Sequence, residues 1–135
     1  MAAFVDTSAL YALLDADDLV HEEASATWDA LRAADEVLFT TNYVLLETAM
    51  LLQRRVGLAA VEGLLRGLAP LLQVHCVGND EHMVGVEALL AARRRDLNLV
   101  DCVSFAVMLH LHVADAFTFD AHFAEQGFTV VPPPA

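Results

Sequence analysis

The sequence contains no lysine, and its seven basic residues are all arginine. P-loop nucleotide hydrolases, Schiff-base enzymes and the switch domains that are phosphorylated on aspartate each need a lysine, so all three classes are excluded. Seven basic residues against 19 acidic ones give a formal net charge of −12. Nonspecific binding to nucleic acid usually depends on a basic surface, and this composition argues against one.

Cysteine is scarce, and long apolar runs are absent. Cys76 and Cys102 lie far apart and form no CxxC pattern, so the sequence predicts neither a disulfide framework nor a set of zinc ligands. Charged residues interrupt the apolar runs before any reaches the roughly 18–20 residues that span a bilayer. No basic segment precedes an apolar stretch near the start. We therefore expect no signal peptide, no membrane partner and a cytoplasmic location.

Apolar residues are abundant, at 57% of 135 residues, whereas typical soluble domains have roughly 45–50%. A chain of this length is the usual size of one domain, so we expect residues 1–135 to form a single domain. The surplus of apolar residues indicates that part of the surface lies in an interface.

Short β-like runs alternate with segments of helical periodicity along the whole chain. The β-like runs are 2–5, 37–39, 71–77, 116–119 and 128–131, and the helical segments are 10–14, 21–33, 43–55, 58–68, 81–95 and a last long helix from 99. This alternation predicts an α/β fold with three layers, α/β/α, around a mainly parallel sheet. In such sheets ligands bind at the carboxyl ends of the strands.

Two aspartates directly follow predicted strands and are therefore expected at that edge of the sheet. Asp6 follows the first strand, and Asp120 follows the run that ends at Phe119. Each has a simpler interpretation. Asp6 is also a good helix N-cap, and Asp120 also suits a turn or a cap before a short helix.

Glu47 lies in a helical segment with apolar neighbours at three and four residues on either side. A buried carboxylate needs a partner, and no arginine lies within one turn of it, so a metal ion would remove the difficulty. The alternative is that Glu47 lies at the solvent edge of its helix. Asp101 also has two interpretations, because an N-cap at Asn98 would place it at N3 of a capping box.

Four carboxylates at one strand edge repel each other unless they share protons or cations. Oxygen ligands of this kind favour Mg²⁺ or Mn²⁺ over zinc. One or two such ions can hold a phosphodiester and activate a water, so the residues indicate hydrolysis of nucleic acid.

The chain resembles the PIN-domain ribonucleases, and among them the VapC-like toxins of toxin–antitoxin pairs. The resemblance runs nearly end to end. It rests on the opening FVDTSAL at residues 4–10, on Glu47, on LVD at 99–101 and on TFDAHF at 118–123.

This resemblance implies a PIN fold and endonucleolytic cleavage of RNA by metal-activated water. It implies an acidic site made of Asp6, Glu47, Asp101 and Asp120. It also implies that Thr7, Ser8 and Thr118 orient the acids or the ion. A homodimer and a small antitoxin protein follow from the family alone.

Several residues stay unassigned or ambiguous. Arg93, Arg94 and Arg95 are candidates for RNA contact, but they also suit the C-terminus of a helix. His110 and His112 are two residues apart and face different sides of a helix, which makes them poor joint zinc ligands. His122 is close enough in sequence to touch the site, and Asp115 has no assigned role. Two other functions stay open: a stand-alone PIN nuclease in RNA processing, and a catalytically silent metal-binding interaction module.

Overall fold

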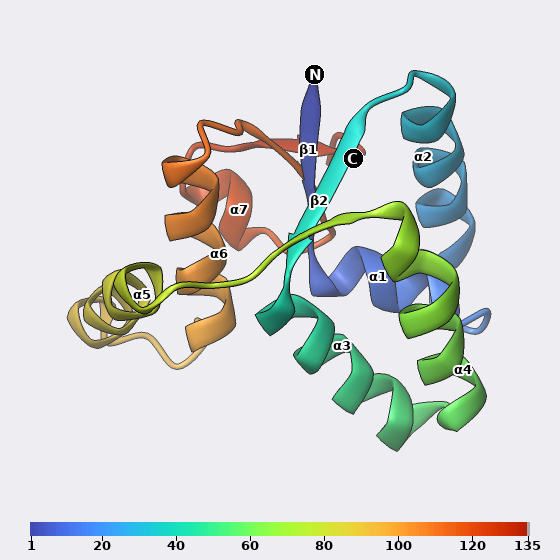
Figure 1. Cartoon of the computed structure of the whole chain (residues 1–135), viewed down its shortest axis with the longest axis horizontal. Helices are drawn as coiled ribbons and strands as arrows, with labels where there is room; N and C mark the ends of the chain where they lie inside the picture. The colour runs from blue at the N-terminus through green and yellow to red at the C-terminus, as the bar shows by residue number, and fades with distance from the viewer. Residues whose placement is uncertain (135) are drawn as a thin grey trace.

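Five short parallel strands form one central sheet in the order β3–β2–β1–β4–β5. The computed structural model describes residues 1–134. Its strands are β1 (Ala2–Val5), β2 (Val37–Thr41), β3 (Gln73–His75), β4 (Asp115–Phe117) and β5 (Thr129–Val131). Figure 1 shows α5 (Asn79–Ala92) and α6 (Leu99–His110) on one side of the strands, and α1 (Thr7–Leu14), α2 (His21–Ala33) and α4 (Leu58–Glu62) on the other. The predicted three-layer α/β/α fold is confirmed.

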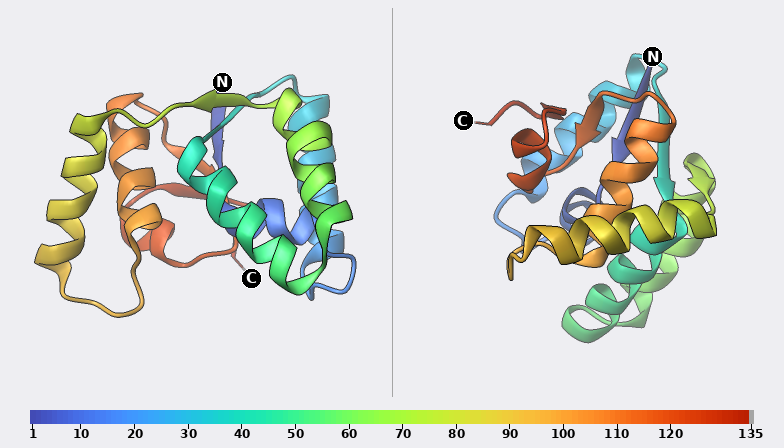
Figure 2. Two further views of the ribbon diagram at one scale, coloured as in Figure 1. Left: turned by 60° about the horizontal axis from the view of Figure 1, so that its bottom comes forward. Right: turned by 90° about the vertical axis from the view of Figure 1, so that its left-hand side faces the viewer.

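The helices are α1 (Thr7–Leu14), α2 (His21–Ala33), α3 (Asn42–Arg55), α4 (Leu58–Glu62), α5 (Asn79–Ala92), α6 (Leu99–His110) and α7 (His122–Glu125). Figure 2 shows α5 and α6 packed side by side, with α3 between them and α4. Within residues 1–134, no helix combines the length and the apolar character needed to cross a membrane.

The order of the strands determines where a site can form. From β1 the chain builds outward through β2 to β3, and then returns to place β4 on the other side of β1. Val5 and Phe117, the last residues of β1 and β4, are directly paired. The direction of winding reverses at β1, and such switch points open a crevice at the carboxyl ends of the strands. Asp6 and Thr118 are the first residues beyond these ends.

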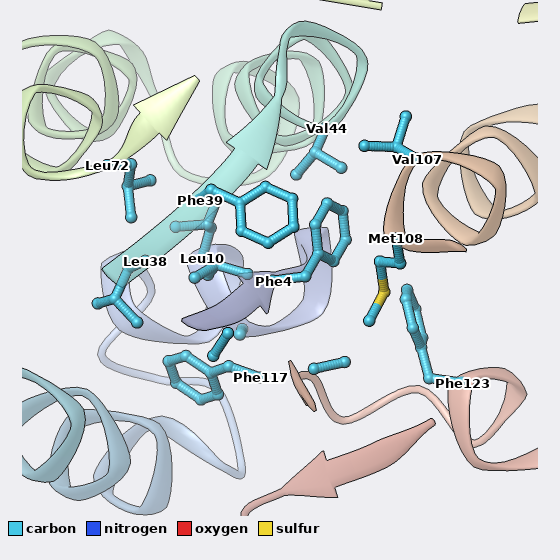
Figure 3. Close-up of a cluster of buried hydrophobic side chains, with 14 of the residues drawn as sticks. Phe4, Leu10, Leu38, Phe39, Val44, Leu72, Val107, Met108, Phe117 and Phe123 are labelled. Carbon is cyan, nitrogen blue, oxygen red and sulfur yellow. The ribbon is translucent and has the colours of Figure 1, made fainter. Parts of the chain in front are cut away.

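Aromatic and aliphatic side chains fill the space between sheet and helices (Figure 3). The Phe4 ring contacts Phe39 at 5.3 Å and Phe123 at 6.1 Å between centroids. Because both faces of the sheet are covered at its centre, β1 is apolar over its whole length, AAFV, whereas the edge strand β3 has the polar and mostly exposed sequence QVH. The tight core fixes β1 and β4 and so fixes the residues that follow them.

The segment from residue 58 to residue 75 differs from the sequence prediction. The helix predicted at 58–68 is α-helical only to Glu62, and then forms a π-helical stretch, Gly63–Leu68. A 3-10 turn, Ala69–Leu71, follows, so the strand predicted from 71 begins at Gln73. Glycines weaken α-helical structure here, and Pro70 has no N–H to continue the helix.

The helix predicted at 81–95 is shifted toward the N-terminus. It begins at Asn79, where the Gly78 N–H donates to Glu81 Oε1 at 3.0 Å, and His75 contacts the same carboxylate at 2.8 Å. It ends at Ala92 because Arg93 adopts a left-handed conformation, with φ of 50°. The three arginines therefore lie in the loop after the helix.

Candidate active site

The four predicted acids come from four parts of the fold and line one cavity. Asp6 follows β1, Glu47 lies in the middle of α3, Asp101 lies in the first turn of α6, and Asp120 follows β4. The cavity has a volume of about 340 Å³. Its other walls come from Thr7, Ser8, Tyr11, Asp18, Val20, Leu51, Arg55, Asn98 and Phe119. The structure thus brings together acids that are up to 114 residues apart in the sequence.

Asp6 stands at the N-cap position of α1, but its side chain makes no capping hydrogen bond. Its Oδ2 instead accepts hydrogen bonds from Ser8 Oγ at 3.0 Å and from Thr118 Oγ1 at 2.9 Å. The residue is 3% exposed. Burial raises the pKa of Asp6 to about 6, and the charge of Asp120 adds to the rise, although the hydrogen bonds oppose it. The geometry does not support the simple capping interpretation.

Glu47 is half-buried and is held at both oxygens. Thr7 Oγ1 donates to Oε1 at 2.7 Å, and Asn98 Nδ2 donates to Oε2 at 3.2 Å. These donors come from α1 and from the N-cap of α6, so they fix the carboxylate between two other elements of the site. Glu47 therefore faces the cavity rather than the open solvent edge of α3.

Asp101 combines both of the interpretations that its sequence allowed. Asn98 Oδ1 accepts from the Asp101 N–H at 2.9 Å, and the Asn98 N–H donates to Asp101 Oδ2 at 3.2 Å, which completes the capping box. The same side chain lines the acidic cavity. Burial is the main cause that raises the pKa of Asp101 to about 7, and the charges of Asp6, Asp120 and Glu47 raise it further against the Asn98 hydrogen bond.

Asp120 is the fourth acid of the site, and His122 lies beside it. The His122 N–H donates to Asp120 Oδ1 at 2.9 Å, as the turn interpretation expected. The His122 Nδ1 atom lies 2.8 Å from the same oxygen, but in poor alignment for a hydrogen bond. One ligand atom each from Asp101, Asp120 and His122 lie within 4.8 Å of one another. His122 thus joins the acids, as its place two residues after Asp120 suggested.

The three hydroxyl residues named from the resemblance all contact this site. Besides the bonds to Asp6 and Glu47, Ser8 Oγ lies 3.1 Å from Thr118 Oγ1 and accepts from the Phe119 N–H at 2.9 Å. Thr118 Oγ1 also accepts from the Asp120 N–H at 2.9 Å. The hydroxyls therefore tie the first turn of α1 to the loop after β4.

The run of three arginines begins at the C-cap of α5, close to the helix C-terminus that one of its two interpretations predicted. Arg93, Arg94 and Arg95 are not among the residues that line the acidic cavity. Arg94 instead pairs with Asp96 at 2.6 Å and with Glu125 at 2.9 Å.

The arginine that does line the cavity is Arg55, which sequence reasoning missed. A signal for it exists, because Glu47, Leu51 and Arg55 follow the helical spacing i, i+4, i+8 and so share one face of α3.

The site has the features of a divalent-cation site. Its four carboxylates offer hard oxygen ligands, and two of them are buried enough to have raised pKa values. Burial of several like charges is unfavourable unless a cation joins them, and within residues 1–134 the cavity lining contains Arg55 as its one arginine. The residues present therefore fit a hydrated ion of the Mg²⁺ type.

Comparison with known proteins gives an independent result. Residues 3–128 match the PIN domain model. Two curated relatives, both described as 23S rRNA-specific endonuclease VapC20, come from Mycobacterium tuberculosis strains CDC 1551 and H37Rv. Each is 37% identical to this chain over 131 residues, and the match covers 96% of this chain and 98% of the relative.

The crystal structure of Mycobacterium tuberculosis VapC20, described as a sarcin-ricin loop cleaving toxin, superposes with a TM-score of 0.84. It is 34% identical to this chain, and the match covers 95% of this chain and 97% of that one. The chain therefore belongs to the PIN-domain family, in which it is a VapC-like endoribonuclease.

Proposed function

We propose that this protein is the toxin of a toxin–antitoxin pair and cuts ribosomal RNA in an Mg²⁺-dependent reaction. The observation that carries this proposal is the convergence of Asp6, Glu47, Asp101 and Asp120 on one cavity, in a chain similar to VapC20 over nearly its full length. We also propose that residues 1–135 act as a single nuclease domain in the cytoplasm, where ribosomes are found.

We assign the four carboxylates as the residues that hold the ion, with Mn²⁺ as an acceptable substitute. When bound, the ion supplies Lewis-acid stabilisation of charge on the phosphodiester and lowers the pKa of a water. The protein supplies orientation: Ser8 and Thr118 fix Asp6, while Thr7 and Asn98 fix Glu47. Groups held in this way need little reorganisation during the reaction.

The position of the site supports a structured RNA loop as the substrate. The acids line a cavity of about 340 Å³ beside the carboxyl ends of β1 and β4. Proteins that read RNA sequence mostly bind such loops, whose bases are unstacked. The sarcin-ricin loop, which VapC20 is described as cleaving, belongs to this class.

The proposal includes protein partners: a second copy of the chain and a small antitoxin. An apolar groove lies directly beside the acids, with Tyr43, Met50, Leu99 and Val100 among its lining residues. Met50 is 60% exposed there. Exposed apolar surface next to an active site is suited to a protein that covers it.

The decisive experiment is cleavage of a synthetic sarcin-ricin hairpin by protein freed of any co-purified antitoxin. The reaction is run with Mg²⁺, with Mn²⁺ and with EDTA, and a scrambled hairpin of equal length reports specificity. Asp101→Asn is the test variant because the amide can keep the capping hydrogen bonds while it removes the charge. Asp29→Asn, on the exposed face of α2, is the matched control.

We expect metal-dependent cutting by wild type and by Asp29→Asn, and loss of cutting by Asp101→Asn. Metal-dependent cutting of an unrelated RNA alone would redirect the proposal to a processing nuclease. Metal binding without any cutting would replace it with the silent binding module.

A further inference from the structure

We infer that Arg55 is a substrate-binding residue that contacts a backbone phosphate of the RNA next to the scissile bond. This inference rests on the proposed function and extends it, because it assigns to one side chain the phosphate contact that the composition of the protein makes difficult.

The position of Arg55 is the first argument. It is the last residue of α3 and lines the same cavity as five acids, which are Asp6, Asp18, Glu47, Asp101 and Asp120. Within the described residues 1–134, it is the one basic side chain among the residues that line this cavity. A phosphate that enters the cavity therefore meets several negative charges and one fixed positive charge.

The availability of Arg55 is the second argument. Its side chain is exposed, and the arginine ion pairs within residues 1–134 belong to Arg94. Its guanidinium carbon lies 5.6 Å from the centre of the Tyr11 ring. The Tyr11 hydroxyl donates to Asp15 Oδ2 at 2.7 Å, so the ring is itself held in place. The guanidinium thus lies over the ring and near its hydroxyl group, which orients it and leaves N–H donors on its other edge for a phosphate.

Electrostatics gives the third argument. The protein carries a formal charge of −12, so RNA approaches it against a general repulsion. A bound ion offsets only part of the charge of the four carboxylates. A guanidinium on the wall of the cavity can bind a phosphate in a bidentate manner and offset this repulsion where the chain must enter.

A purely structural role for Arg55 is the alternative, because a cation in the last turn of a helix interacts favourably with the helix dipole. Arg54 shares that role, since it lies in the same last turn and is also exposed. Arg54, however, lines the neighbouring apolar groove rather than the acidic cavity. Arg54 is therefore a matched control that separates dipole effects from phosphate contact.

The test compares wild type with Arg55→Gln, Arg54→Gln and Arg55→Lys in steady-state cleavage of the sarcin-ricin hairpin with Mg²⁺. We expect Arg55→Gln to raise KM about tenfold, with a smaller effect on kcat, as for a lost charge-assisted contact of about 1.4 kcal/mol. The slope of log KM against log salt concentration should be smaller in Arg55→Gln than in wild type by about 0.7, which is the value for one phosphate contact on a single strand. Arg55→Lys should recover part of the loss.

Arg54→Gln should behave as wild type in KM and in salt dependence. Equal KM values for Arg55→Gln and Arg54→Gln would overturn the inference, as would an unchanged salt slope in Arg55→Gln. Calorimetry with Mg²⁺ alone should show that Arg55→Gln binds the ion at least as tightly as wild type, because it removes a nearby cation. Weaker ion binding would point to an effect on the acids instead.

A binding experiment separates this inference from the proposed function. Fluorescence anisotropy of the labelled hairpin is measured in the Asp101→Asn background, with Arg55→Gln or Arg54→Gln added. A wild type that cuts no RNA would defeat the proposed function. Equal hairpin affinities of the two double variants would defeat the role of Arg55, whether or not the wild type cuts.

Discussion

Replacement of Asp6 by asparagine should stabilise the metal-free protein while it removes the activity. The carboxylate is buried among other acids, and its ionised form is the unfavourable one. Asparagine is nearly the same size and can still accept the hydrogen bonds of Ser8 and Thr118 through its Oδ1. The substitution therefore removes the charge with little change in packing.

The magnitude follows from the pKa. A rise from 3.8 to about 6, at about 1.4 kcal/mol per pKa unit, corresponds to about 3 kcal/mol as an upper limit. The folded-state pKa is raised, so the penalty is absent below the unfolded value of 3.8, grows as the pH rises through the window from 3.8 to 6, and is complete above about 6. The gain in the variant should be about 1–3 kcal/mol at pH 8 and small at pH 4.

Urea unfolding in EDTA at pH 8, 6 and 4 measures this gain, with Asp29→Asn as the exposed control. The unfolding midpoint of Asp6→Asn should exceed that of wild type at pH 8, and the difference should shrink as the pH falls. Addition of Mg²⁺ should raise the Tm of wild type more than that of the variant, because the ion binds the native state alone. An Asp6→Asn protein less stable than wild type at pH 8, or a gain independent of pH, would refute the reasoning.

Three further predictions concern packing, capping and the ion. Gly85→Ala should destabilise the protein by about 1–3 kcal/mol in urea unfolding, because its Cβ would clash with Val103 Cγ2 and lie 3.0 Å from Val103 N. Within the described residues, the Cβ of Gly67→Ala would meet no atom within 4 Å apart from its own local backbone, so this variant should not show the loss. Similar losses at both glycines would contradict the packing argument. Asn98→Ala should lower the free energy of unfolding by about 1 kcal/mol, because the cap of α6 is lost. It should also slow cleavage, because Glu47 Oε2 loses its hydrogen bond. Full activity in this variant would show that this contact is dispensable. Mg²⁺ at about 100 times its Kd should stabilise wild type by about 2.7 kcal/mol, and an equal gain in Asp6→Asn would place the ion elsewhere.

The sheet and most helices could be predicted from the sequence, because each buried strand is a short apolar run that ends at a polar residue. Asp6 could be placed for the same reason, since a residue after a strand in a parallel sheet has only one edge to occupy. Asp120 was placed from a strand predicted to reach Phe119, whereas β4 ends at Phe117 and Asp120 lies in the loop that follows. The π-helical stretch at Gly63–Leu68 could not be predicted, because the apolar pattern there fits an α-helix equally well. Which hydrogen-bonding pattern forms depends on how the segment packs.

The residues around the acids were harder to predict than the acids themselves. Asn98 was expected only as a cap, and its second contact with Glu47 requires α3 and α6 to meet, which no local pattern encodes. Arg55 was overlooked because its relation to Glu47 spans two helical turns. The run Arg93–Arg95 is a candidate for RNA contact because it clusters positive charge, and the left-handed conformation of Arg93 places the run just beyond the end of α5. Local rules identify single side chains, whereas their partners depend on tertiary contacts.

The hydrogen bond between Thr118 and Asp6 joins residues 112 positions apart, and β1 pairs with β4 over a similar separation. Contacts of such long range form late in folding, because the entropy cost of closing a large loop comes before the stabilisation that the contacts provide. The acidic site therefore exists only once the middle of the sheet has assembled. Asp6 and Thr118 come together only when β1 and β4 pair, so a chain without this pairing would have no assembled site. Recovery of activity during refolding should accordingly follow the slowest step of sheet assembly, rather than the early formation of helices.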